Sequence, residues 1–318
     1  MNTMTSNKLN AASAHDSTLP VGRKSTFRAE GVACAATIYH PSNDSSGKSI
    51  KPTPAILMIH GWGGTQLILF KDFIRRFTEA GYAVMTFDYA GWGASEGLPR
   101  NTINPWARVR TAEAALAHLK AQQDINQDQI VVWGTSFGGG HAIDLAAEHP
   151  ELAGVIAHVP MLNGMAAVKA VPIPRLMRFG FDIAKDLLNP FGRTYIPVVS
   201  APGEYSTMDR DGAGRLEDWV MQELDSPYDN RVTAASLLTM GPYQPRKNLK
   251  RLSMPGLIIG ALRDTVAPFN EAAVRSQVGK HIAISTIDAN HFDPYLAPWF
   301  EDNVSNQLSF LGDILGRR

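Results

Sequence analysis

Short and almost wholly apolar segments alternate with helix-like segments along most of this chain. Residues 55–61 (AILMIHG) and 82–89 (YAVMTFDY) are such apolar segments, and between them residues 70–81 carry apolar side chains at helical spacing. Strands that are apolar on both faces are typical of a parallel sheet with helices packed on both sides. The alternation therefore predicts an α/β protein built on a mostly parallel central sheet.

The other elements expected from periodicity continue this order. We expect further strands at 130–133, 152–160, 255–264 and 281–289, two antiparallel strands within 25–41, and helices at 106–122, 141–149 and 175–188. Helices placed between strands supply the long crossover connections that parallel neighbours need.

The alternation breaks between residues 161 and 247, where eight prolines fall. Proline removes a backbone donor and fixes φ, so dense proline disfavours regular helices and central strands. We therefore expect an insertion after the sixth main strand, forming a cap over the C-terminal edge of the sheet, where ligands bind in open α/β sheets. The expected organisation is a disordered N-terminal tail (1–23), a core domain made of 24–160 and 248–318, and a cap at 161–247.

One serine stands at a predicted strand-to-helix turn, in the segment QIVVWGTSFGGGHAIDLAAEHP (129–150). Gly134 and Gly138 flank Ser136 at two residues on either side, where a sharp turn has no room for a Cβ atom. Such a turn lifts the hydroxyl above the sheet and points a helix N-terminus at the same place. This context favours a nucleophilic role over a simple glycine-rich turn, provided that the rest of the chain supplies a base.

Asp264 and His291 each follow a later predicted strand, in GALRD and NHFDP. A histidine supplies a base that titrates near neutral pH, and a buried carboxylate holds its ring in the useful tautomer. Taken singly, the aspartate fits a helix N-cap, and the histidine is one of nine, of which His60 and His158 also end strands. The chain order Ser136, Asp264, His291 makes a nucleophile, its orienting carboxylate and its base the better interpretation.

The segment HGWGG (60–64) directly follows the predicted strand at 55–61. Its glycines allow the loop to approach Ser136 and to aim a backbone N–H at a substrate oxygen. The N–H groups of Trp62 and Phe137 would then form a two-donor oxyanion hole. A plain strand-to-loop turn is the alternative interpretation.

Together these segments resemble those of the α/β-hydrolase superfamily, from about residue 24 to the end of the chain. The resemblance rests on HGWGG, FDYAGWGASEG, GTSFGG, GALRDTVAP and NHFDP. Within the superfamily, the chain is similar to bacterial proteins related to dienelactone hydrolases and X-prolyl peptidases, and to fungal polyketide transferases. The resemblance implies an α/β-hydrolase fold with Ser136 as nucleophile, His291 as base, Asp264 as its orienting carboxylate, and Trp62 and Phe137 as oxyanion donors.

Departures from these relatives narrow the chemistry. Dienelactone hydrolases proper use a cysteine where this chain has Ser136, and dehalogenases and epoxide hydrolases use an aspartate, so haloalkane and epoxide substrates are not expected. Many relatives carry an arginine where this chain has Ala90. Asp88, in the same loop, resembles a structural turn residue more than a catalyst.

The expected function is transfer of an acyl group from a carboxylic ester or thioester to water, through an acyl-enzyme on Ser136. Two other reactions on the same residues stay open: hydrolysis of amides or peptides, and transfer of the acyl group to an alcohol. A different class also stays open, a ligand-binding protein that keeps the fold without turnover. No metal and no organic cofactor is expected.

The start of the expected cap is rich in apolar side chains, among them Met161, Met177 and Phe181. Methionine adapts to ligands of varied shape. We expect these three residues, with Trp62 as an inner wall, to line an apolar acyl pocket. Packing of the cap against the core is the alternative role.

Charge and cysteine content disfavour several classes of partner. Thirty basic and thirty acidic residues give a formal net charge of +0, which does not favour nucleic acid or an anionic membrane surface. Cys34 is the only cysteine, so no internal disulfide forms, and its apolar surroundings favour an inert buried thiol. With neither a long apolar run nor a signal-peptide core, we expect a cytoplasmic protein that binds a small acyl compound, not nucleic acid or membrane. A homodimer stays open.

Overall fold

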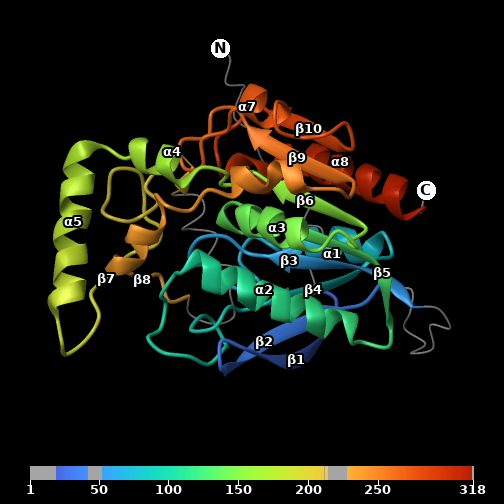
Figure 1. Cartoon of the computed structure of the whole chain (residues 1–318), viewed down its shortest axis with the longest axis horizontal. Helices are drawn as coiled ribbons and strands as arrows, with labels where there is room; N and C mark the ends of the chain where they lie inside the picture. Colours follow the sequence, from blue (N-terminus) through green and yellow to red (C-terminus); the bar gives the residue numbers. More distant parts are fainter. Residues whose placement is uncertain (1–18, 42–51, 211, 214–227, 317–318) are drawn as a thin grey trace, which may run out of the picture.

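The computed structural model describes residues 19–41, 52–210, 212–213 and 228–316, so the predicted N-terminal tail lies outside them up to residue 18. One eight-stranded sheet runs through the molecule in the order β1-β2-β4-β3-β5-β6-β9-β10 (Figure 1). β2 is antiparallel to both β1 and β4, and every other neighbouring pair is parallel. The sheet is therefore mostly parallel, as the sequence predicts.

The strands lie close to the positions expected from apolar periodicity. Their bounds are β1 (Gly22–Ala29), β2 (Val32–Tyr39), β3 (Thr53–Ile59), β4 (Ala83–Phe87), β5 (Ile125–Thr135), β6 (Gly154–His158), β9 (Gly256–Ala261) and β10 (Ile282–Ile287). Strands β3, β4, β6 and β9 are buried at every residue. Burial on both faces explains why these segments read as continuous apolar runs.

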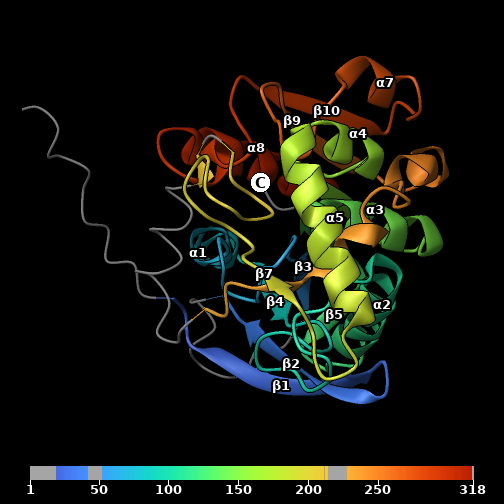
Figure 2. The same ribbon diagram turned by 90° about the vertical axis from the view of Figure 1, so that its left-hand side faces the viewer.

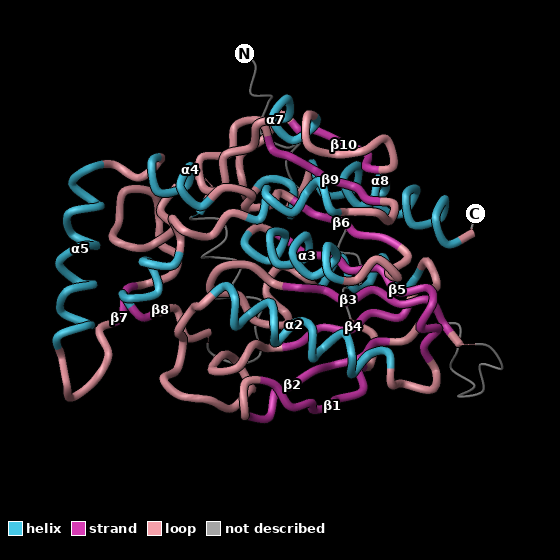
Figure 3. Tube along the Cα trace, in the orientation of Figure 1, coloured by secondary structure: helices cyan, strands magenta, loops and turns pink. Residues whose placement is uncertain are grey.

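Helices cover both faces of the sheet (Figure 1; Figure 3). The main ones are α1 (Lys71–Glu79), α2 (Pro105–Lys120), α3 (Phe137–Glu148) and α8 (Trp299–Leu315). Alternate residues of β3 show which helices share a face, because successive side chains of a strand point to opposite sides. Leu57 belongs to the core cluster that contains α2 and α3 side chains, and Met58 belongs to the cluster that contains α1 and α8 side chains.

Two helices differ from expectation. α3 begins at Phe137 rather than at residue 141, because the glycines that follow let this helix start against neighbouring backbone. α8, which packs with α1 on the second face of the sheet, was not predicted from the sequence.

The segment between β6 and β9 carries shorter elements beside one long helix. They are α4 (Gly164–Lys169), α5 (Ile173–Leu188), β7 (Tyr195–Ile196), β8 (Val232–Thr233), and the 3-10 helices η2 (Ala234–Thr239) and η3 (Pro245–Arg251). α5 stands at one side of the molecule, away from the sheet, and lies in front in the rotated view of Figure 2. Phe179 of α5 packs against Ile196 of β7 and Ala234 of η2. No helix in the described ranges is long and apolar enough to cross a membrane.

Candidate active site

Ser136 lies between β5 and α3, with backbone angles of φ 54° and ψ −123°. A positive φ is unfavourable for a residue with a Cβ atom, so the surrounding structure must hold this turn in place. A Cβ on Gly134 would lie 2.2 Å from the carbonyl oxygen of Gly138, and one on Gly138 would lie 2.3 Å from that of Ile59. Backbone contacts therefore require glycine on both sides of Ser136, as the motif suggests.

Three side chains from three different strand ends form a line of hydrogen bonds. Ser136 follows β5, Asp264 follows β9, and His291 follows β10. His291 Nε2 lies 2.9 Å from Ser136 Oγ, and His291 Nδ1 lies 2.5 Å from Asp264 Oδ2. Asp264 and His291 are both buried, so solvent screens their interaction weakly. The structure thus brings together the three residues chosen from the sequence.

The second carboxylate oxygen of Asp264 is bound by backbone donors. Its Oδ1 accepts hydrogen bonds from the N–H groups of Val266 at 2.8 Å and Ala267 at 2.7 Å, which fixes the carboxylate beside the histidine ring. The following helix, α7 (Glu271–Arg275), has Asn270 as its N-cap. Asp264 is therefore not the N-cap of that helix, and the alternative role left open by the sequence does not apply.

This arrangement can move a proton from the serine to the histidine. With the Nδ1–H of His291 donated to Asp264, the lone pair on Nε2 faces the Ser136 hydroxyl, which donates to it. The tautomer follows from these hydrogen-bond partners. A hydroxyl bonded in this way can give up its proton while its oxygen attacks an electrophilic carbon.

The other buried histidines have different surroundings. His158 lies between Thr135 Oγ1 at 2.9 Å and Asn303 Nδ2 at 2.8 Å, and burial lowers its pKa to about 3. Burial also holds the pKa values of His60 and His141 well below the ordinary value. Three neutral rings thus surround the site without hydrogen-bonding Ser136. Among the described residues, no group of three or more His, Cys, Asp or Glu side chains could hold a metal ion.

The loop at residues 60–64 lies against Ser136. A Cβ on Gly61 would lie 3.0 Å from the Ser136 Cβ, so glycine allows this close approach. In the described part of the chain, neither the Trp62 N–H nor the Phe137 N–H donates to another backbone group. Phe137 is the first residue of α3, where a backbone N–H has no intrahelical acceptor. The oxyanion role predicted from the sequence requires N–H groups that are free of backbone acceptors in this way.

A cavity of about 240 Å³ opens beside Ser136. Trp62 and Met161, for which the sequence predicts a role in an acyl pocket, line it together with Phe137. α5 supplies a further wall, formed by Leu176, Phe179, Gly180 and Ile183. Apart from Ser136, two threonines and one arginine, the lining is apolar or glycine, which suits a hydrocarbon chain.

Met177 and Phe181 do not line this cavity, and the prediction for these two residues was wrong. The two residues are 73% and 71% exposed, on the outer side of α5. α5 carries two apolar rows at helical spacing, one outward through these residues and one inward through Leu176 and Phe179. Periodicity detects both rows, but only the packing of the helix decides which row faces the cavity.

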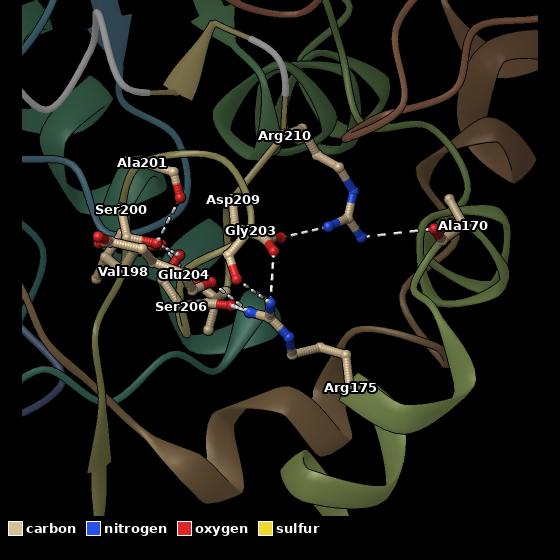
Figure 4. Close-up of polar contacts among 11 residues, drawn as sticks. Ala170, Arg175, Val198, Ser200, Ala201, Gly203, Glu204, Ser206, Asp209 and Arg210 are labelled. Atoms are coloured by element: carbon tan, nitrogen blue, oxygen red, sulfur yellow. Dashed lines mark hydrogen bonds and ion pairs between the residues drawn. The ribbon is translucent and has the colours of Figure 1, made fainter.

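A charged cluster at the cavity wall was not predicted from the sequence. Figure 4 shows Asp209 held between two arginines: Arg175 Nη2 lies 2.7 Å from Asp209 Oδ2, and Arg210 Nη1 bonds Oδ1. Arg175 also donates to the carbonyl oxygens of Glu204 and Ser206. Arg210 lines the cavity. No local sequence signal distinguishes Arg210 from other arginines, because its position depends on contacts between distant segments.

Asp88 and Cys34 have structural surroundings, as the sequence suggests. The carboxylate of Asp88 accepts hydrogen bonds from the backbone N–H groups of Gln66 at 2.8 Å and Ala94 at 2.9 Å, and so joins two loops. Cys34 is a free, buried thiol in β2.

Comparison with known proteins gives consistent matches over most of the chain. A family model described as serine aminopeptidase, S33, matches residues 50–286. The quorum-quenching protein AidA of Acinetobacter baumannii is 30% identical over 294 residues, covering 91% of this chain and 94% of AidA. The thiohydrolase AneE of Aspergillus aculeatus is 29% identical over 274 residues, covering 82% of this chain and 86% of that protein.

A solved structure shows the same fold. The α/β hydrolase GrgF from Penicillium sp., also named a polyketide transferase, superposes with a TM-score of 0.73 at 20% identity, covering 93% of this chain and 99% of GrgF. The resemblance to α/β hydrolases seen in the sequence is thereby confirmed. This chain belongs to the serine aminopeptidase S33 family of α/β hydrolases, and it is a hydrolase.

Proposed function

We propose that this protein hydrolyses carboxylic esters or thioesters of apolar acids through an acyl-enzyme on Ser136. The observation that carries the proposal is the line from Ser136 Oγ to His291, at 2.9 Å, and from His291 to Asp264, at 2.5 Å, beside a largely apolar cavity. A protein that only binds its ligand gains nothing from a buried carboxylate that orients a base toward a serine.

In the first half of the proposed reaction, Ser136 Oγ attacks the carbonyl carbon while its proton passes to His291 Nε2. The N–H groups of Trp62 and Phe137 stabilise the negative charge that develops on the carbonyl oxygen. As the tetrahedral intermediate collapses, the C–O or C–S bond breaks, and His291 gives its proton to the departing alkoxide or thiolate. The acyl group remains as an ester of Ser136.

Water completes the cycle in the second half. His291 takes a proton from a water molecule whose oxygen attacks the acyl carbon, and a second tetrahedral intermediate forms. Its collapse breaks the bond to Ser136 Oγ, which regains a proton from His291, and the carboxylic acid leaves. Asp264 keeps the ring oriented and stabilises the imidazolium in both halves.

Two cavities suggest where the two parts of the substrate lie. The larger cavity, of about 240 Å³, borders Ser136 and Phe137, whereas a smaller one of about 50 Å³ borders Ser136 and His291. The leaving group must lie beside His291, because this ring protonates it. We therefore assign the acyl chain to the larger cavity and the leaving group to the smaller one.

The names of two relatives favour particular acceptors and leaving groups. The thiohydrolase AneE supports a thioester substrate for this chain. The polyketide transferase GrgF supports a second candidate function, transfer of the acyl group to an alcohol in place of water. Both reactions pass through the same acyl-enzyme, so they differ only in the nucleophile of the second half.

The proposal is tested with Ser136→Ala against Ser305→Ala, which removes an exposed hydroxyl on α8. We expect the wild type and Ser305→Ala to hydrolyse p-nitrophenyl esters or acyl thioesters and to react with a fluorophosphonate probe. Ser136→Ala should lose the labelling and roughly 10⁴-fold or more in kcat, as is usual for such a nucleophile. Its circular-dichroism spectrum should not change.

Three outcomes would contradict or redirect the proposal. Full turnover by a folded Ser136→Ala protein would overturn it. Tight binding of acyl compounds by a wild type that is neither labelled nor active would indicate a ligand-binding protein. Formation of a new ester when an alcohol is added would identify acyl transfer as the main reaction.

A further inference from the structure

Arg108 of α2 is a buried cation that the proposed mechanism does not yet use. Only 3% of the surface of Arg108 is exposed to solvent. The guanidinium lies over the rings of Tyr89, at 4.4 Å, and Trp92, at 4.9 Å. In the described part of the chain, no carboxylate lies within ion-pair distance, and Nε and Nη2 have no hydrogen-bond partner. Two aromatic faces thus lie against the guanidinium.

Such a residue is costly to bury. An ionised group without a counter-ion in the interior loses its hydration, and stacking on aromatic rings offsets only part of that loss. Burial lowers the pKa of Arg108 to about 10, so the side chain keeps its charge at neutral pH. Stability alone therefore favours an apolar residue of similar length at this position.

Within the described residues, the one hydrogen bond made by the side chain of Arg108 is directed at the loop beside Ser136. Its Nη1 donates to the carbonyl oxygen of Gly61 at 3.1 Å, and the Gly64 N–H donates to the same oxygen at 3.3 Å. The carbonyl of Gly61 and the N–H of Trp62 belong to one peptide group. A charged donor on that carbonyl draws electron density from the peptide and makes its N–H a stronger donor at the other end.

We infer that Arg108 is a positioning residue that polarises the Gly61–Trp62 peptide and so strengthens the Trp62 N–H as an oxyanion donor. This inference rests on the proposed function. The effect grows as charge develops on the substrate oxygen, so Arg108 stabilises the transition state more than the bound ester. Replacing Arg108 is therefore expected to lower kcat and to leave KM nearly unchanged.

Two further contacts hold the same loop without adding charge. The indole Nε1 of Trp62 donates to Thr207 Oγ1 at 3.0 Å, and the hydroxyl of Tyr228 donates to the Gly63 carbonyl oxygen at 2.6 Å. We expect these contacts to keep the loop in place when Arg108 is replaced. A change in rate on replacing Arg108 therefore reports polarisation of the peptide rather than collapse of the loop.

The test compares Arg108→Met, Arg108→Gln and Arg108→Lys with Arg110→Met. Arg110 lies on the same helix, is 56% exposed and pairs with Glu30, so it serves as a matched control. With kinetics scaled to the fraction of enzyme titrated by the fluorophosphonate, we expect Arg108→Met to lose roughly 10- to 100-fold in kcat, below the loss on deleting a donor outright. KM should stay within about twofold.

The intermediate variants separate charge from hydrogen bonding. Arg108→Lys keeps a charged donor and should recover most of the activity, whereas Arg108→Gln, with an uncharged donor, should fall between Lys and Met. Octylboronic acid forms a tetrahedral adduct with a serine. Its inhibition constant should rise across the series by the same factor as kcat/KM falls. Binding of 1-octanol, which fills the acyl cavity without a developing charge, should not change.

Several results would overturn the inference. A Met variant with a lower Tm but unchanged kcat and unchanged boronic acid affinity would make Arg108 purely structural. A loss confined to KM would place it in substrate binding instead. If Arg108→Met does not fold, Arg108→Gln decides instead, and a kcat equal to that of the wild type would overturn the inference. Absence of labelling and turnover in the wild type and Arg110→Met alike would instead refute the proposed function.

Discussion

Gly138 and Gly180 are both helical glycines, yet they lie under opposite constraints. A Cβ on Gly138 would lie 2.3 Å from the Ile59 carbonyl oxygen and 2.5 Å from that of His60, both of them backbone atoms that cannot move aside. A Cβ on Gly180 would meet nothing within 4 Å. The two sites therefore give a matched test of whether the turn at Ser136 depends on close backbone contact.

We predict that Gly138→Ala destabilises the fold by about 1–3 kcal/mol, the usual cost of forcing extra atoms into a packed site. It should also reduce esterase activity, because the strand-to-helix turn would shift. Gly180→Ala should raise stability by up to about 1 kcal/mol, since alanine is the better helix former. Urea unfolding measures both changes. Equal effects from the two substitutions would show that backbone contact does not determine the turn.

At the residue scale, the sequence was sufficient to choose site residues whose side chains lie at strand ends. Ser136, Asp264 and His291 could be chosen because parallel strands bring their carboxyl ends to one edge of a sheet. Arg108 could not be chosen in this way, because its contact with Gly61 spans 47 positions in the chain. A lone arginine on an expected helix carries no local signal of such a contact.

At the element scale, α5 shows both the strength and the limit of periodicity. Its existence could be predicted, and its bounds (Ile173–Leu188) agree closely with the expected 175–188. Its inner face could not be predicted, because Met177 continues an apolar row as regular as the one through Leu176. The helix α8 was missed for a related reason: its buried face includes polar residues such as Asn303 and Gln307, which weaken the apolar pattern.

We predict that the inner row of α5 sets the preferred acyl length. Leu176→Ala should favour longer chains by enlarging the cavity, and Gly180→Leu should favour shorter ones by filling open space. Each methylene that gains or loses burial changes kcat/KM by roughly fourfold, from about 0.8 kcal/mol per buried CH₂. Met177→Ala, on the exposed row, is the control and should leave the profile from acetate to octanoate unchanged. A shift caused by Met177→Ala but not by Leu176→Ala would place the acyl chain elsewhere.

At the scale of the whole molecule, buried histidines couple folding to pH. His60, His141 and His158 are all buried, and burial holds each of their pKa values below the ordinary value of about 6.5, for His158 at about 3. The charge of Arg108 lowers the pKa of His60 and His141 further. These rings are therefore neutral in the folded protein at pH values where the unfolded chain has already protonated them.

The sign of the effect follows from the protons bound in each state. A group whose pKa is depressed by folding contributes stability above its unfolded pKa, and that stability is lost as the pH falls toward the folded value. We therefore predict that the free energy of unfolding falls as the pH drops from about 7.5 to 5.5. Each of the three histidines contributes a slope that approaches about 1.4 kcal/mol per pH unit once the unfolded chain is fully protonated.

The measurement is urea unfolding at a series of pH values, with His158→Gln compared with His40→Gln. Glutamine takes up no proton, so the slope should flatten by up to about 1.4 kcal/mol per pH unit, whatever the change in stability at neutral pH. His40 lies closer to the surface, with 31% of its side chain exposed, and its replacement controls for the removal of a histidine outside the buried set. A slope as steep in His158→Gln as in the wild type would mean that His158 carries a proton in the folded protein, against the effect expected of its burial.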